Sequence, residues 1–156
     1  MSSCHSIQRI LIVDDEPYNI LSLQLLFRQV GYNMLNNIAD RAYNGKHAIN
    51  IVQESLLEGK HIYSLIFMDL SMPIVDGFVA TKRIRQFYKQ HKVTQPFIVA
   101  CTGHVEYDYI KQAWHSHMDE VAPKPIDLTL LKAIIEENIK IEWGLGSRHY
   151  SNALKD

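Results

Sequence analysis

A chain of 156 residues is long enough for one domain with its own core and too short for two domains of full size. Its 16 Lys and Arg residues against 17 Asp and Glu residues give a formal net charge of -1, which excludes an overall basic field for binding nucleic acid or an anionic membrane surface. The sequence has no signal-peptide pattern, no apolar run of about 18 residues and no disulfide framework, so we expect a cytoplasmic protein.

Short apolar runs alternate along the chain with segments whose apolar residues recur every three or four positions, which is typical of strands alternating with helices. The first half predicts a strand at 10–13, a helix from Pro17 to Val30, a strand at 38–43, a helix from Ala48 to Glu58 and a strand at 65–68. The second half predicts a helix from Ala80 to Phe87, a strand at 97–101, a helix from Val105 to Trp114, a strand at 120–122 and a helix from Asp127 to Ile139.

This alternation predicts an α/β fold, because parallel strands joined by right-handed helical crossovers carry helices on both faces of the sheet. We expect a doubly wound parallel sheet of five strands in the order 2-1-3-4-5, flanked by five helices. The sheet and helices would form a single domain at 8–140, with tails at 1–7 and 141–156 and no effector domain.

Polar residues stand where four of the predicted strands end. Asp14 and Asp15 follow the first strand, Asp69 the third, Thr102 the fourth and Lys124 the fifth. Strands one and three are neighbours where the strand order reverses, so we expect three carboxylates to meet there. They would repel one another unless a cation lies among them, and their oxygen ligands favour Mg²⁺. With a lysine and a hydroxyl nearby, such a site is typical of phosphoryl transfer, with Asp69 as the nucleophile.

Five segments match, in order, the motifs of a known family. They are ILIVDDEPYN at 10–19, AYNGKHAI at 42–49, YSLIFMDLSMPIVDGFVATKRIR at 63–85, FIVACTGH at 97–104 and APKPID at 122–127. Together they resemble the receiver domain of two-component response regulators, including the receivers of hybrid sensor kinases. The resemblance implies a flavodoxin-like receiver fold in a His-to-Asp phosphorelay, whose phosphohistidine donor is a histidine kinase or a histidine phosphotransfer protein. It also allows the chain to be part of a membrane-anchored hybrid kinase.

The resemblance assigns roles to the strand-end acids. It implies that Asp69 is the phosphoacceptor and that Asp15, Asp69 and the backbone carbonyl of Ser71 hold Mg²⁺, with Asp14 acting through water. It implies no enzyme in the usual sense, but a phosphoacceptor that promotes its own phosphorylation and dephosphorylation.

The resemblance also assigns a switch. It implies that Thr102 and Lys124 bind the phosphoryl group and that the Lys124-Pro125 peptide bond is cis. Contacts with the phosphoryl group would then change the surface formed by the fourth predicted helix, the fifth strand and the last helix, and this surface also allows a weak homodimer. Partner docking is expected near the first helix or on the basic helix after Gly77.

Three positions modify these expectations. Val121 stands where the family has an aromatic residue, so the usual coupling of Thr102 to an aromatic side chain is not expected in that form. His104 is expected at the rim of the phosphoryl site. Because neither His104 nor Ser71 carries the amide or carboxylate best suited to hold an attacking water, we expect slow loss of the phosphoryl group.

Two other functions remain open. A receiver that binds partners without being phosphorylated is favoured by Val121 and disfavoured by the complete set of acids. A Mg²⁺-dependent phosphohydrolase would need a second acid two residues after Asp69, where this chain has Ser71. A transition-metal site is disfavoured, because His115 and His117 do not share a helical face and no cysteine accompanies them.

Overall fold

The computed structural model describes residues 9–31 and 39–138. Its five parallel strands are β1 (Arg9–Val13), β2 (Ala39–Ala42), β3 (Tyr63–Asp69), β4 (Phe97–Thr102) and β5 (Glu120–Pro123). The helices in the described ranges are α1 (Pro17–Gln29), α3 (Gly45–Leu57), α4 (Gly77–Gln90), α5 (Tyr107–His115) and α6 (Leu128–Asn138). The sheet order is β2-β1-β3-β4-β5, so the predicted α/β fold and strand order are confirmed.

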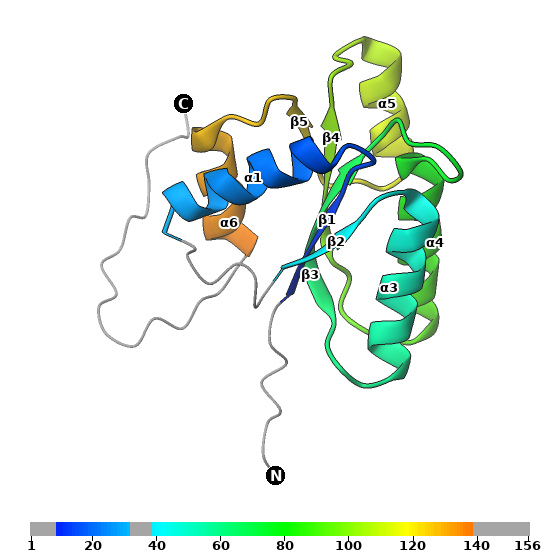
Figure 1. Cartoon of the computed structure of the whole chain (residues 1–156). Coiled ribbons are helices and arrows are strands. Elements are labelled where there is room, and N and C mark those ends of the chain that lie inside the picture. The colour runs from blue at the N-terminus through cyan, green and yellow to red at the C-terminus, as the bar shows by residue number, and fades with distance from the viewer. Residues whose placement is uncertain (1–8, 32–38, 139–156) are drawn as a thin grey trace.

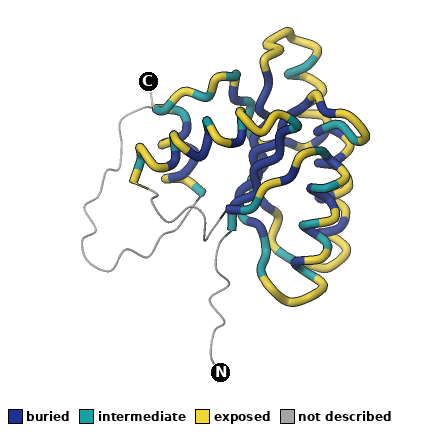
Figure 2. The backbone as a smooth tube through the Cα atoms, viewed as in Figure 1, coloured by how far each residue is buried: buried dark blue, intermediate teal, exposed yellow. Residues whose placement is uncertain are grey.

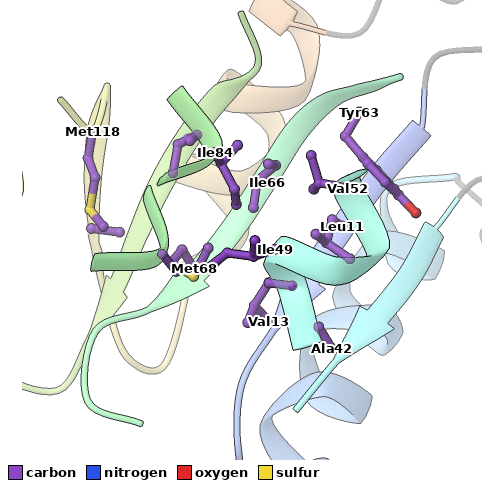
Figure 3. Close-up of a cluster of buried hydrophobic side chains, with 14 of the residues drawn as sticks. Leu11, Val13, Ala42, Ile49, Val52, Tyr63, Ile66, Met68, Ile84 and Met118 are labelled. Atoms are coloured by element: carbon purple, nitrogen blue, oxygen red, sulfur yellow. The ribbon is translucent and has the colours of Figure 1, made fainter. Parts of the chain in front are cut away.

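The helices cover both faces of the sheet, with α1 and α6 on one side and α3 and α4 on the other (Figure 1). Successive strand residues point to opposite faces. Leu11 and Ile66 therefore pack beneath α3 and α4, whereas Ile10 and Phe67 pack beneath α1 and α6. Figure 3 shows the first of these two cores, and Figure 2 shows the buried strands at the centre of the molecule. Burial on both faces explains why β1, β3 and β4 read as nearly continuous apolar runs, whereas the edge strand β2 carries the less buried Asp40 and Arg41.

Side-chain caps set the start of three helices. Asn44 accepts a hydrogen bond from the backbone N–H of His47 at 2.8 Å, and Asp76 accepts one from Val79 at 2.8 Å. Asp127 accepts hydrogen bonds from the backbone N–H groups of Thr129 and Leu130 in the first turn of α6, as the sequence predicted. Such caps satisfy backbone donors that have no partner within the helix.

The structure corrects several predicted boundaries. β3 starts at Tyr63, two residues before the predicted start, because Tyr63 already pairs with Arg9 of β1. β2 ends at Ala42 rather than at residue 43. Ile38 and Ile139, which were assigned to a strand and a helix, lie outside the described residues, as do the two tails.

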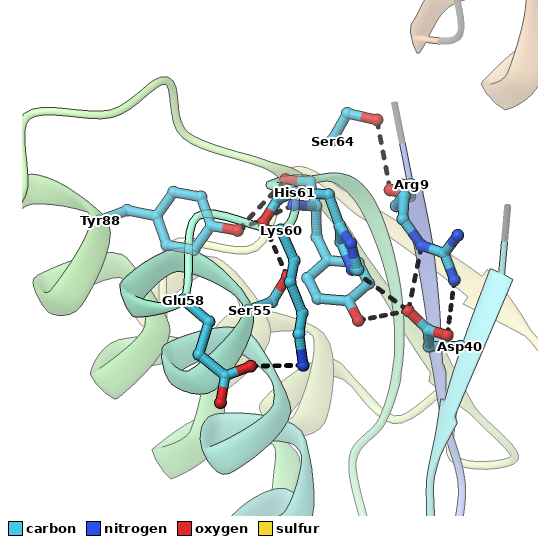
Figure 4. A network of polar contacts seen from close by, with 9 residues as sticks. Arg9, Asp40, Ser55, Glu58, Lys60, His61, Ser64 and Tyr88 are labelled. Carbon is cyan, nitrogen blue, oxygen red and sulfur yellow. Dashed lines mark hydrogen bonds and ion pairs between the residues drawn. The ribbon is translucent and has the colours of Figure 1, made fainter. Parts of the chain in front are cut away.

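A polar cluster joins the amino ends of the first three strands (Figure 4). The Arg9 guanidinium donates two hydrogen bonds to the Asp40 carboxylate, at 3.1 and 2.7 Å, and the Tyr63 hydroxyl donates to the same group. Burial alone would raise the pKa of Asp40, but these hydrogen bonds outweigh burial and the pKa lies below its ordinary value. The cluster lies at the opposite end of the sheet from the acids at the carboxyl ends of the strands.

The turn before β5 contains a residue with an unusual backbone conformation. His117 has a positive φ of 64°, a backbone angle that residues other than glycine rarely adopt. Arg85 of α4 donates two hydrogen bonds to the His117 carbonyl, at 3.0 and 2.9 Å, and a third to Asp119 at 2.6 Å. The guanidinium therefore holds this turn against α4.

Among the described helices, none is long and apolar enough to cross a lipid bilayer.

Candidate functional site

The carboxyl ends of β1, β3 and β5 bring the predicted acids and lysine together. In the parallel pair β1–β3, Val13 lies opposite Met68, so the next residues, Asp14 and Asp69, leave the sheet side by side. Carboxylate oxygens of Asp14, Asp15 and Asp69 lie within 4.8 Å of one another. The chain folds this way because Asp14 directly follows β1, Asp15 comes next, and Asp69 ends β3, and the core fixes both strands on both faces.

Lys124 completes the cluster. Its ammonium lies 2.6 Å from Asp14 Oδ2 and 3.0 Å from Asp69 Oδ1, and the side chains of both acids are less than a tenth exposed. Burial alone would lower the pKa of Lys124, but its hydrogen bonds to Asp14 and Asp69 raise the pKa above its ordinary value. The lysine is therefore a permanent cation beside Asp69.

Asp14 is held by a residue that sequence reasoning missed. Its Oδ1 accepts hydrogen bonds from the backbone N–H of Glu16 at 2.9 Å and from Asn19 Nδ2 at 3.1 Å. Asn19 lies in the first turn of α1, within the motif at 10–19, and this position was the only signal of its role. Since Lys124 occupies Oδ2, both oxygens of Asp14 are already engaged.

Asp69 is an unusual carboxyl group. Burial raises its pKa from 3.8 to about 6, against the opposing effect of Lys124, and the negative charge of Asp14 adds to the rise. Three carboxylates lie together and Lys124 pairs with two of them, so the cluster has more acidic groups than basic ones. Hard oxygen donors at this spacing fit a divalent cation such as Mg²⁺, which accepts one or two carboxylates and keeps several waters. When bound, such an ion would offset the charge on phosphoryl oxygens.

Gly77, which the sequence suggested only as part of a turn, contacts the chain just beyond Asp69. A Cβ on Gly77 would lie 2.1 Å from the Asp69 carbonyl oxygen, and the Gly77 N–H donates to the Leu70 carbonyl at 3.0 Å. The first turn of α4 therefore packs directly on the backbone that presents the Asp69 side chain. Only glycine fits this close approach.

Thr102 lies at the end of β4, on the same edge of the sheet, and is buried. Its hydroxyl accepts a hydrogen bond from the His104 N–H at 2.9 Å and donates to the His104 carbonyl at 3.2 Å. The His104 side chain is half exposed and stacks on Tyr109 of α5, with ring centroids 4.8 Å apart. The Thr102 hydroxyl thus bonds to the backbone of the loop that follows β4. The stacking of His104 on Tyr109, which the sequence did not predict, joins this loop to α5.

The remaining predicted positions flank the cluster. Val121, in β5, is partly buried against the core beneath α4. Ser71 is exposed two residues after Asp69. The Lys124-Pro125 bond is cis, as expected. A hollow of about 240 Å³ lies beside Asp14 and Lys124, between α1 and the turn at Pro125, and most of its wall is apolar.

Comparison with known proteins agrees with this geometry. The sequence pattern of the response regulator receiver domain matches residues 10–136. The sensor histidine kinase GacS of Pseudomonas protegens is 32% identical over 142 residues, which are 90% of this chain and 14% of that protein. The osmosensing histidine protein kinase SLN1 of Saccharomyces cerevisiae is 35% identical over 129 residues, 83% of this chain and 10% of that protein. The chain thus spans a small part of these relatives.

Solved structures give the same result. The receiver domain of the Saccharomyces cerevisiae response regulator Ssk1, crystallised with the histidine phosphotransfer protein Ypd1, superimposes with a TM-score of 0.68 at 30% identity, covering 85% of this chain and 88% of that one. The receiver domain of the Arabidopsis thaliana histidine kinase CKI1, complexed with Mg²⁺ and BeF₃⁻, superimposes with a TM-score of 0.69 at 26% identity. The superposition covers 83% of this chain and 88% of that one. By its sequence pattern, its fold and the acids at its strand ends, the chain belongs to the family of response regulator receiver domains.

Proposed function

We propose that this chain accepts a phosphoryl group from phosphohistidine onto Asp69, in the presence of Mg²⁺. In this reaction an oxygen of Asp69 attacks the phosphorus atom, the phosphorus–nitrogen bond breaks, and its electron pair stays on the imidazole, which takes up a proton. The observation that carries the proposal is the placement of the Lys124 ammonium 3.0 Å from Asp69, beside two further carboxylates within 4.8 Å. A nucleophile, a cation and a set of oxygen ligands thus share one edge of the sheet.

The proposed roles of the acids follow from which oxygens are already engaged. Asp15, Asp69 and the backbone carbonyl of Ser71 would hold Mg²⁺ directly. Asp14 would act through water, because its two oxygens already accept hydrogen bonds from Glu16, Asn19 and Lys124.

The proposed switch begins at Thr102. Its hydroxyl would turn from the His104 carbonyl to donate to a phosphoryl oxygen, while Lys124 would pair with another. The loss of the hydrogen bond to His104 would release the loop after β4 and change the surface of α5, β5 and α6. Because the phosphorylated and unphosphorylated forms would bind partners differently, phosphorylation would shift the population toward one form.

The proposed partner is a histidine kinase or a histidine phosphotransfer protein. Hybrid signal transduction histidine kinases of Dictyostelium discoideum are among the relatives, and the similar Ssk1 receiver domain was crystallised with such a phosphotransfer protein. In this chain α1 exposes three large apolar side chains, Tyr18, Leu21 and Leu25, at 76%, 52% and 48%. Since α1 begins three residues after Asp14, this row would seat a partner whose phosphohistidine reaches Asp69. The basic helix α4 is the second candidate surface.

A cytoplasmic location, or attachment to a membrane-anchored hybrid kinase, is part of the proposal. The domain limits 8–140, and a weak homodimer through α5, β5 and α6, stay predictions.

The test is incubation with acetyl phosphate and Mg²⁺, followed by intact mass measurement. We expect the protein to gain the mass of one phosphoryl group, and Asp69→Asn to gain none, because an amide cannot form the acyl phosphate. Asp108→Asn, an exposed acid on α5, is the matched control and should label like the parent protein.

Three outcomes would contradict the proposal. Labelling of Asp69→Asn would place the phosphoacceptor elsewhere. No labelling of the parent protein from acetyl phosphate or a phosphohistidine donor would favour a receiver that binds partners without phosphorylation. Rapid turnover of a general phosphate ester would favour the phosphohydrolase.

A second prediction concerns the lifetime of the acyl phosphate. The half-exposed His104 side chain and exposed Ser71 offer no amide or carboxylate to orient a water, so we expect slow loss of the phosphoryl group. His104→Gln would supply an amide and should speed the loss, whereas His115→Gln, on the exposed side of α5, should not. Mass measurement over time after removal of acetyl phosphate gives the rates, and a half-life of seconds for the parent protein would refute the prediction.

A further inference from the structure

A second hollow, of about 310 Å³, lies between α1 and the edge strand β2. Its polar wall consists of Gln24 and Arg28 from α1, Arg41 from β2 and Tyr43, which follows β2. Apolar side chains of α1, including Leu21, line the rest. None of the clustered acids and neither Lys124 nor Thr102 lines this hollow, so it is separate from the phosphoryl site.

Arg41 is fixed in the wall by a buried neutral partner. Gln24 is only 5% exposed, and with its amide oxygen turned toward Arg41 it accepts hydrogen bonds from Nε at 2.9 Å and from Nη2 at 3.2 Å. Gln24 orients the guanidinium without neutralising its charge. Arg28 follows Gln24 by one helical turn, and therefore lies on the same side of α1.

The two arginines have no counter-ion within the described ranges 9–31 and 39–138. The neighbouring acid in the sequence, Asp40, points to the opposite side of β2, where it pairs with Arg9 at 2.7 Å. The sequence from Gln29 to Ala39 contains no Asp or Glu. Two positive charges therefore face one hollow, and no carboxylate among the residues that the structure describes pairs with either of them.

We propose that this hollow binds a compact organic phosphate, a phosphate monoester with a small organic group. A monocarboxylate has one charge and two oxygens, which satisfy one guanidinium. A phosphate monoester carries nearly two charges and three terminal oxygens, so it can pair with Arg28 and Arg41 together. The Tyr43 hydroxyl adds a neutral donor, and the apolar wall on α1 would contact the organic group.

The site would also influence docking. Leu21 lines the hollow and is 52% exposed in the apolar row of α1, so a bound phosphate ester would change the surface offered to a phosphorelay partner. This consequence rests on the proposed function, whereas the anion site itself does not.

The experiment titrates the full chain with glycerol phosphate by calorimetry, in buffer free of Mg²⁺ and with a chelator, so that phosphate cannot enter the acidic site through a bound metal ion. Inorganic phosphate, succinate and acetate are titrated in parallel. We expect glycerol phosphate to bind most tightly, and Arg28→Gln or Arg41→Gln to weaken it by about tenfold or more. Arg83→Gln, an exposed arginine on α4, is the matched control and should leave the affinity unchanged.

Circular dichroism checks that each variant folds. Arg41→Lys keeps the positive charge but loses the planar pair of guanidinium donors, so it should bind glycerol phosphate with intermediate affinity. The proposal is overturned if the parent protein binds no glycerol phosphate, or if Arg83→Gln loses as much affinity as Arg41→Gln. It is also overturned if succinate binds as tightly, or if inorganic phosphate binds more tightly than the ester, which would indicate an adventitious ion only. Labelling of Asp69 by acetyl phosphate should persist in all these variants, so failure of this site and failure of the proposed function give different results.

Discussion

Burial determines the protonation of Asp69 when no metal ion is bound. The residue is 6% exposed, and its pKa rises from 3.8 to about 6. Between these two values the folded protein retains a proton on Asp69 that the unfolded chain has lost. The folded state therefore binds more protons, and the contribution of Asp69 to stability falls as pH rises through this window. At neutral pH the buried, ionised carboxylate of Asp69 lowers the stability of the fold, and binding of a cation beside it would remove this destabilisation.

This destabilisation predicts that Asp69→Asn stabilises the metal-free protein at pH 7. A pKa difference of about two units corresponds to about 1–3 kcal/mol, which the neutral amide would avoid. Urea unfolding at pH 7 and pH 4, with a chelator present, would measure the effect. The gain should be present at pH 7 and should disappear at pH 4, where Asp69 of the parent protein is also neutral.

Asp108→Asn serves again as the control. Its side chain is exposed in the first turn of α5, so the amide should cost at most about 0.3–1 kcal/mol at pH 7, opposite in sign to the gain expected of Asp69→Asn. A loss of stability in Asp69→Asn at pH 7 would show that the attraction between Asp69 and Lys124 outweighs the burial of the carboxylate.

At the scale of elements, the contact between α4 and the end of β3 positions Asp69, the proposed phosphoacceptor. The Gly77 N–H bonds to the Leu70 carbonyl, and the space for a Cβ is occupied by the Asp69 backbone. Asp76 caps the same helix, so α4 begins immediately against the site. The start of α4 thus fixes the backbone that carries Asp69.

We expect Gly77→Ala to destabilise the fold by about 2 kcal/mol, because a methyl group must displace the backbone beside Asp69. The same displacement should slow labelling by acetyl phosphate. Gly103→Ala is the matched control, since a Cβ there has no atom within 4 Å and its φ is not positive, so the stability should change by less than about 0.5 kcal/mol. Urea unfolding and labelling rates measure both effects, and equal behaviour of the two variants would contradict the assigned contact.

At the scale of the whole molecule, the sheet separates two surfaces. The helices α1 and α6 cover one face and α3 and α4 the other (Figure 1), and each face exposes a large leucine, Leu25 on α1 at 48% and Leu57 on α3 at 68%. Among the described helices, only α1 combines exposed apolar residues with a start next to Asp14 and Asp15. Docking on α1 would bring a phosphohistidine to the acids, whereas docking on the exposed side of α3 would not.

We therefore expect Leu25→Asp to slow phosphotransfer from a phosphorylated histidine phosphotransfer protein by about tenfold, since a charge would be placed in an apolar contact. Labelling by acetyl phosphate, which needs no docking surface, should remain unchanged. Leu57→Asp makes the same chemical change on the other face and should affect neither rate. Equal slowing by both variants would rule out α1 as the docking surface.

The sequence alone determined the α/β class, the five strands and the identity of the clustered acids and lysine. These features depend on local patterns: apolar runs mark strands buried on both faces, and the residue after such a run must leave the sheet at its edge. The order of the strands and the residues at their ends are therefore enough to place Asp14, Asp69 and Lys124 together. The boundaries were less accurate, because the start of β3 at Tyr63 is set by pairing with Arg9 rather than by local apolarity.

Only the tertiary structure decided which groups touch within the site. The bond from Asn19 to Asp14, the contact of Gly77 with Asp69 and the turn of the Thr102 hydroxyl toward His104 depend on side-chain rotamers and loop paths that no spacing encodes. The same holds for the hollow shared by Arg28 and Arg41, which come from different elements. Local sequence patterns are enough to predict where strands end and which residue types lie there, whereas packing of the whole fold sets the contacts between side chains.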